Sequence, residues 1–146
     1  MDNFTREVQI RWADLDPNAH PRHSVYYDWG AWCRIEFLQS HGLKADHMHQ
    51  FHFGPILFRE ECKFRKEIRP GDKVTIDLKL IKAKKDYSRW SIAHDIIKNG
   101  DTLSAILTVD GAWLDTQKRK LAVPVPAVVG EVFGQMPKAK DFEWID

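Results

Sequence analysis

The chain has 146 residues, of which 43% are hydrophobic and 29% are charged, and its formal net charge is +1. Because single domains usually span roughly 100 to 200 residues, we expect residues 1–146 to form one domain. The near balance of 22 basic and 21 acidic side chains excludes the strong positive excess of general nucleic-acid binders and of proteins that bind membrane surfaces.

Cysteine usage and the N-terminal residues indicate a cellular compartment. Cys33 and Cys62 belong to no Cys-x-x-Cys pair, which is typical of reduced thiols in a cytosolic protein. Residues 1–7 carry charges where a signal peptide needs apolar residues. No stretch approaches the roughly 18 apolar residues of a membrane span. We therefore expect a cytoplasmic protein that does not interact with membranes.

The N-terminal pattern predicts a strand followed by a loop. Apolar and polar residues alternate from Phe4 to Trp12, which is the period of two expected for a half-buried strand. The alternation stops at Ala13. Residues 14–23 contain two prolines among turn-forming side chains, so we expect an ordered, irregular loop.

A long helix is predicted from Val25 to about His41. Ser24 can cap its start, no proline interrupts it, and Gly42 stands where helices commonly end. Because a helix that is apolar around most of its circumference must be surrounded by protein, we expect a sheet to curl around this one. The apolar residues are Val25, Tyr26, Trp29, Trp32, Cys33, Ile35, Phe37 and Leu38.

The rest of the chain predicts antiparallel strands. Apolar and polar residues alternate in four stretches, residues 56–68, 74–80, 90–96 and 103–109. Pro70-Gly71-Asp72 predicts a turn, and Asn99-Gly100 is a strong hairpin signal. Residues 121–126 suit a terminal edge segment, and residues 127–133 a short helix. This order of elements predicts an α+β domain with one central helix.

The candidate chemistry lies in the loop and at the start of the helix. Asp14, Asp16, Asn18, His20 and His23 stand directly before the helix or at its first turn. Backbone N–H groups at a helix start favour negative charge, so amides near His23 can polarise a carbonyl. The Asp16 carboxylate can then attack that carbonyl or activate water.

The run Asp16-Pro17-Asn18-Ala19-His20, with His23, Tyr26 and Trp29 after it, resembles the signature of hotdog-fold acyl thioesterases. The similarity is to the 4-hydroxybenzoyl-CoA thioesterase type and to plant acyl-carrier-protein thioesterases, and it covers roughly residues 4–126. The chain departs from the family's usual residues at Pro21, Arg22 and Ala31.

The resemblance implies a hotdog fold, in which an antiparallel sheet wraps one long helix and two subunits pair to build active sites at their interface. A homodimer, or a dimer of dimers, is therefore expected. The implied reaction is hydrolysis of an acyl-CoA or acyl-carrier-protein thioester. Asp16 is the implied nucleophile or general base, and the His23 amide holds the carbonyl. Asn18 and His20 match side chains implicated in catalysis in the acyl-carrier-protein branch.

The resemblance also suggests binding residues. Lys84, Lys85 and Arg89 flank a turn that is similar to the family's nucleotide-contacting segment, so they are candidates for the phosphates of coenzyme A. Tyr26 and Trp29 are candidates for the acyl pocket, although helix aromatics of this kind first of all fill a core. No cofactor is expected, because coenzyme A is part of the substrate.

Simpler interpretations stand beside these. Asp14 and Asp16 can cap backbone amides in a loop, and loop histidines such as His20 and His23 are commonly surface groups. The four histidines of residues 41–52 lack a familiar zinc spacing, so a mobile lid is favoured there over a metal site.

Two other functions suit the same fold. A hotdog dehydratase or hydratase would need the ring of His20 or His23 in the pocket, together with an acid. A non-catalytic acyl-CoA-binding protein would bind the thioester without releasing a thiol, and the intact Asp16-x-Asn18-x-His20 run argues against it.

Overall fold

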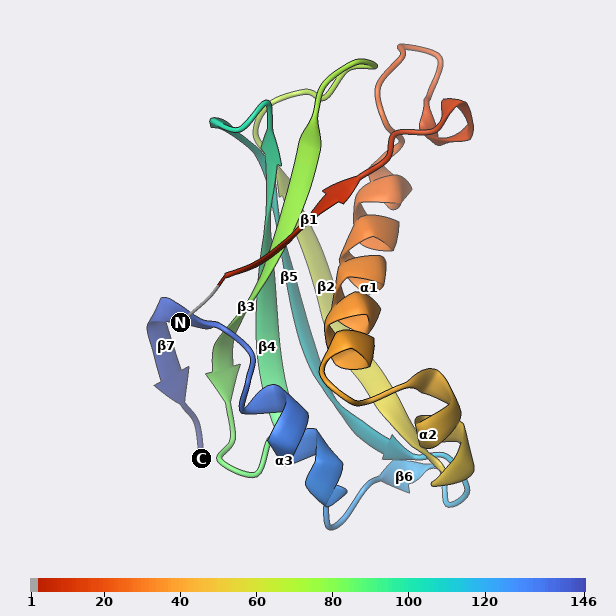
Figure 1. Cartoon of the computed structure of the whole chain (residues 1–146), viewed down its shortest axis with the longest axis vertical. Coiled ribbons are helices and arrows are strands. Elements are labelled where there is room, and N and C mark those ends of the chain that lie inside the picture. The colour runs from red at the N-terminus through yellow and green to blue at the C-terminus, as the bar shows by residue number, and fades with distance from the viewer. Residues whose placement is uncertain (1–2) are drawn as a thin grey trace.

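The computed structural model describes residues 3–146 (Figure 1). A short 3-10 turn (Trp12–Asp14) stands between the first strand and the first helix. The helices and strands follow in the order β1 (Phe4–Val8), α1 (His23–Ser40), α2 (Ala45–Gln50), β2 (Phe53–Phe64), β3 (Val74–Ala83), β4 (Arg89–Lys98), β5 (Thr102–Asp115), β6 (Lys120–Leu121), α3 (Ala127–Phe133) and β7 (Lys138–Trp144).

The strands form one sheet in the order β1-β3-β4-β5-β2, with β6 beside β5 and β7 beside β3. Every pair is antiparallel except β3 and β7. At the β4–β5 turn both Asn99 and Gly100 have positive φ, of 54° and 80°, as a tight hairpin turn requires. The sheet curls against one side of α1 (Figure 1), which confirms the predicted α+β architecture.

One face of α1 supplies much of the core. Tyr26, Trp29, Cys33 and Phe37 are buried at helical spacing. Trp32, on another side of the helix, is 38% exposed. The sheet therefore covers only part of α1, whereas the sequence predicted that protein surrounds most of it.

The first strand is shorter than predicted. β1 ends at Val8, and Trp12 lies in the 3-10 turn with 89% of its surface exposed. Asp14 explains the change, because its carboxylate accepts the backbone N–H of Arg11 at 2.9 Å and the guanidinium of Arg11 at 2.7 Å. These bonds join residues three positions apart and close a turn where the alternation predicted extended chain.

The C-terminal region confirms one prediction and corrects another. The short helix predicted at residues 127–133 is α3, but β6 (Lys120–Leu121) includes only Leu121 of the edge segment predicted at residues 121–126. The final strand β7 and the short helix α2 were not predicted. Across residues 3–146, no helix combines the length and hydropathy that crossing a membrane requires.

Candidate active site

The loop before α1 is ordered by its own backbone. Arg22 donates its backbone N–H to the carbonyl of Asp14 at 2.7 Å, and Asp16 donates to the carbonyl of His20 at 2.8 Å. Leu15 and Pro21 form an isolated β-bridge between these bonds. The loop thus folds back on itself beside the start of α1 (Figure 1), and Asp16 lines the same hollow as His23.

The two aspartates of the loop have different roles. Asp14 is 1% exposed, and its carboxylate is committed to Arg11, whose hydrogen bond holds the pKa of Asp14 below its ordinary value. Asp16 is partly exposed, and its Oδ1 accepts the backbone N–H of Asn18 at 2.8 Å and of His20 at 3.1 Å. Among residues 3–146 no hydrogen bond is made to Asp16 Oδ2. One oxygen of Asp16 therefore shapes the loop, and the other is available.

A hollow of about 410 Å³ lies in front of the start of α1. Asp16, His20, His23 and Tyr26 line one side of it, and residues 64–68, at and just beyond the end of β2, line the other. The structure thus brings together four of the residues singled out in the sequence. The Tyr26 ring packs edge-on against Phe64, with 4.9 Å between ring centroids.

Both the backbone and the ring of His20 make polar contacts. Its backbone N–H donates to Asp16, and its ring Nε2 lies 2.9 Å from Glu67 Oε2 across the hollow. Arg69 also donates a hydrogen bond to Glu67. This bond and the charge of Arg69 lower the pKa of the Glu67 carboxyl group, and His20 makes a smaller contribution in the same direction. The His20 ring is therefore paired with an acid and not with Asp16.

Asn18 and Trp29 lie elsewhere. Asn18 is exposed and does not line the hollow; its backbone N–H, and not its side chain, bonds Asp16. Trp29 is buried and lines a separate cleft of about 520 Å³ between α1 and the Arg11–Asp14 turn. The rings of Tyr26 and Trp29 pack against each other at a tilt of 55°, with 5.2 Å between centroids, but they border different spaces.

The basic residues proposed for coenzyme A surround the β3–β4 turn. Lys85 and Arg89 are exposed, and Lys84 is half-buried. The Arg89 guanidinium lies over the ring of Phe58 on β2, 4.6 Å from its centroid. This turn lies at the end of the sheet opposite to the Asp16 loop (Figure 1). The fold of one chain therefore does not place these cations beside Asp16.

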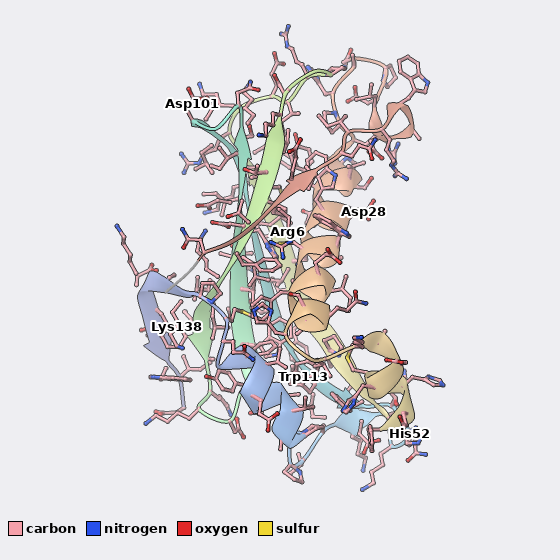
Figure 2. All side chains as sticks on the ribbon, viewed as in Figure 1. Arg6, Asp28, His52, Asp101, Trp113 and Lys138 are labelled. Atoms are coloured by element: carbon pink, nitrogen blue, oxygen red, sulfur yellow. The ribbon has the colours of Figure 1, made fainter. Side chains whose placement is uncertain are left out.

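An apolar cavity of about 180 Å³ was not foreseen from the sequence. It lies between the second half of α1, the start of β2 and α3, and Trp113, labelled in Figure 2, forms part of its wall. Other lining residues are Ala31, Ile35, Leu57, Trp90 and Phe133. The sequence feature that could have indicated this cavity is an apolar residue of α1 outside the buried face of the helix, such as Ile35.

A buried polar pair lies beside this cavity. Arg34, which lines it, has its Nη1 atom 3.0 Å from Nε2 of His94, and His94 Nδ1 lies 2.8 Å from the carbonyl oxygen of Asp77. Burial lowers the pKa of His94 to about 3, so its ring is neutral at ordinary pH. The neutral ring donates from Nδ1 to Asp77 and accepts from Arg34 at Nε2.

The histidines of residues 41–52 form no metal centre within the part of the chain described by the structure, where no three His, Cys, Asp or Glu side chains gather suitably. His47 instead packs against Phe51 and Phe53, with ring centroids at 4.7 and 6.2 Å. Met48 of the short helix α2 is buried in the core.

Comparison with known families decides the identity of the fold and its general activity. The sequence profile of the thioesterase-like superfamily matches residues 10–133. The chain belongs to the thioesterase-like superfamily. The predicted family is confirmed, and with it the general activity of a thioester hydrolase. No curated protein matches this superfamily member at a significant level.

Solved structures agree with the thioesterase-like fold. A hypothetical protein from Staphylococcus aureus, solved in complex with CoA, has a TM-score of 0.82 at 19% identity, covering 95% of this chain and 89% of that one. A 1,4-dihydroxy-2-naphthoyl-CoA thioesterase from Synechocystis has a TM-score of 0.80 at 19% identity, covering 92% and 97%. A thioesterase from Thermus thermophilus, complexed with coenzyme A and Zn, has a TM-score of 0.71 at 24% identity, covering 88% and 95%. These likenesses show the hotdog fold.

Proposed function

We propose that this protein hydrolyses acyl-CoA thioesters with Asp16 as the catalytic carboxylate. The observation that carries the proposal is the position of Asp16: backbone amides fix its Oδ1 atom, and its side chain lines a hollow at the start of α1. A carboxylate fixed by one oxygen keeps the other for chemistry. Such preorganisation is what acid–base and nucleophilic catalysis require.

The start of α1 supplies the second element of the site. Within residues 3–146, no side chain caps this helix at Arg22, so the first backbone N–H groups, at His23 and Ser24, remain available as donors. They bind the thioester carbonyl oxygen and stabilise the negative charge that grows on it. The exposed position of His23 suits a role for its backbone rather than its ring.

The reaction follows from these two elements. As general base, Asp16 removes a proton from water, and the resulting hydroxide adds to the thioester carbon. The C–S bond then breaks, and the departing thiolate takes the proton to leave coenzyme A and the free acid. As nucleophile, Asp16 would first displace the thiol and form an anhydride that water cleaves.

The site is completed by a second copy of the chain. β2 is an edge strand, and it exposes Leu57, Phe58 and Phe64 by 41%, 53% and 53%. A long exposed edge strand that carries large apolar side chains is a surface on which another strand can pair. Antiparallel pairing of two β2 strands places the start of one, which lines the apolar cavity, beside the end of the other, which lines the Asp16 hollow.

This pairing also explains two separations within one subunit. Along α1 the cavity begins at Ala31, eight residues or about 12 Å from His23, and the β3–β4 turn lies at the far end of the sheet (Figure 1). A two-fold axis between the paired β2 strands places the cavity end of one subunit beside the Asp16 end of the other. The partner's cavity then receives the acyl group, and Lys84, Lys85 and Arg89 of the partner subunit bind the phosphates. The relative solved with CoA supports this carrier.

The pairing of His20 with Glu67 favours one other function. A histidine with an acid partner is what a hydratase or dehydratase uses to move a proton. Family membership favours hydrolysis over this function.

A thiol-release assay tests the proposal. The purified protein is given short, long, branched and aromatic acyl-CoAs, and free thiol is measured over time. We expect enzyme-dependent release for at least one class. Binding without release from any of them would contradict hydrolysis, and hydration of crotonyl-CoA without thiol release would favour the hydratase.

A further inference from the structure

We propose that the apolar cavity selects acyl groups that end in a second carboxylate, and that Arg34 is the cation that binds this carboxylate. The substrate class is thus a short dicarboxylic acid joined to the carrier through one of its ends. This inference rests on the proposed hydrolysis of acyl-CoA, and it concerns the acyl end of the same composite site.

Hydrogen-bond donors without acceptors belong to residues that line the cavity. The indoles of Trp90 and Trp113, which line it, are 3% and 1% exposed, and among residues 3–146 neither Nε1 atom has a partner. The side chain of Arg34 is 13% exposed and bonds His94 through Nη1; its Nη2 lies 3.7 Å from Glu60, beyond hydrogen-bond distance. A guanidinium has five N–H donors, so most of its capacity is unused.

Two acceptors beside the cavity, the His94 ring and the Asp77 carbonyl, are already hydrogen-bonded. His94 uses Nε2 to accept from Arg34, and the carbonyl of Asp77 accepts from His94 Nδ1. A ligand amine would place further donors and positive charge beside the Arg34 guanidinium, and a ligand hydroxyl would accept from it with only one oxygen. A carboxylate only accepts, and its planar geometry matches the fork of a guanidinium.

The positive charge of Arg34 also favours a carboxylate ligand. Burial lowers the pKa of Arg34, because the charged form loses hydration, and its nearest acid, Glu60, is itself part-exposed on the edge strand β2. A ligand carboxylate would compensate the buried positive charge more closely than Glu60 does. Buried charges are usually paired in this way.

The size of the cavity limits the acyl chain. Its volume is about 180 Å³, slightly more than the roughly 150 Å³ of an engineered cavity that binds benzene. It therefore holds about six heavy atoms. Three methylenes and a carboxylate, the part of a glutaryl group beyond the thioester carbon, have this size. The aromatic and aliphatic walls suit the methylenes.

Gly30 lets Arg34 reach its position. A Cβ atom on Gly30 would lie 3.2 Å from Arg34 Nη1 and 3.6 Å from His94 Cδ2. The first distance is shorter than an ordinary contact, so an alanine there displaces the guanidinium by a few tenths of an ångström. Because alanine favours a helix more than glycine does, Gly30→Ala perturbs Arg34 while preserving the helix.

The test compares glutaryl-CoA with 5-methylhexanoyl-CoA, which has the same shape without the charge. Calorimetry on Asp16→Asn, in which turnover should be at least about 100-fold slower, should show about tenfold tighter binding of glutaryl-CoA, as expected for one buried ion-paired hydrogen bond. In the Asp16→Asn/Arg34→Met protein the preference should disappear or reverse. If that double variant does not fold, the Asp16→Asn/Gly30→Ala protein should show a smaller preference for glutaryl-CoA than Asp16→Asn alone.

Each result decides the inference separately from the proposed function. Equal or weaker binding of glutaryl-CoA overturns the dicarboxylate preference even when hydrolysis occurs, and so does tighter binding of a 4-hydroxybenzoyl thioester. A preference that survives Arg34→Met overturns the role of Arg34. If the wild type hydrolyses no acyl-CoA, the proposed function fails, while the binding comparison still supports or overturns this inference.

Discussion

Arg34 donates a hydrogen bond to a neutral His94 inside the protein, with 3.0 Å between Nη1 and Nε2. The ring of His94 is fully buried between this guanidinium and the carbonyl of Asp77. The neutral form is maintained because burial and the nearby positive charge of Arg34 both oppose protonation of the ring. Arg34 lines the cavity, and the shifted pKa of its partner His94 makes the free energy of unfolding depend on pH.

Stability should therefore fall in acid because of His94. Its folded pKa of about 3 lies below the ordinary value of 6.5, so the unfolded chain takes up the proton first as the pH falls. The contribution is complete above pH 6.5 and is lost toward pH 3, by up to ~1.4 kcal/mol per pH unit. Urea unfolding of the wild type and of His94→Gln between about pH 4 and 8 should show a difference that shrinks in acid. A difference that is constant with pH would contradict this account.

Gly111 should be intolerant of any side chain. A Cβ atom there would overlap Cη2 of Trp90 and lie 2.6 Å from the carbonyl oxygen of Ile56. Gly111→Ala must move Trp90, a wall of the cavity, and should reduce the free energy of unfolding by about 1–3 kcal/mol. Gly130→Ala is the matched control: nothing lies within 4 Å of its Cβ position, and alanine should stabilise α3. Equal stabilities of the two variants would show that Trp90 is not held against Gly111.

The strands and the loop before α1 were largely predictable, because both depend on local sequence. Alternation of side chains predicted β3, β4 and β5, and the prolines and aspartates before His23 predicted the loop that holds Asp16. Arg34 and His94 are 60 residues apart, so their contact depends on how α1 packs on the sheet. The parallel pairing of β7 with β3 is equally non-local. No short-range pattern contains such information.

A charge on the edge of β2 should separate the subunits. Leu57→Lys places an ammonium group at a 41% exposed apolar position of the edge strand, and a lysine on an edge strand opposes further pairing. Light scattering should show a dimer for the wild type and a monomer for the variant. Val123→Lys, at an 88% exposed position outside β2, should remain a dimer. A dimeric Leu57→Lys protein would exclude the proposed β2 interface.

Removal of two lysines should weaken binding of the carrier without changing the chemical step. In Lys84→Ala/Lys85→Ala the KM for acyl-CoA should rise about fivefold, since each exposed ion pair contributes up to ~1 kcal/mol. The kcat value should be unchanged. The KM for the N-acetylcysteamine thioester of the same acid, which has no phosphate, should not move. A parallel rise for both substrates would mean that these lysines do not bind phosphate.

The central claim is that Asp16 performs the chemistry, and the turnover number of Asp16→Asn tests it most directly. Asparagine keeps an oxygen that accepts the N–H groups of Asn18 and His20, so the melting temperature and the circular dichroism spectrum should match the wild type. The kcat on the best acyl-CoA should fall by roughly 10²–10⁴-fold, as expected for loss of a general base. A folded Asp16→Asn protein with wild-type turnover would contradict the account.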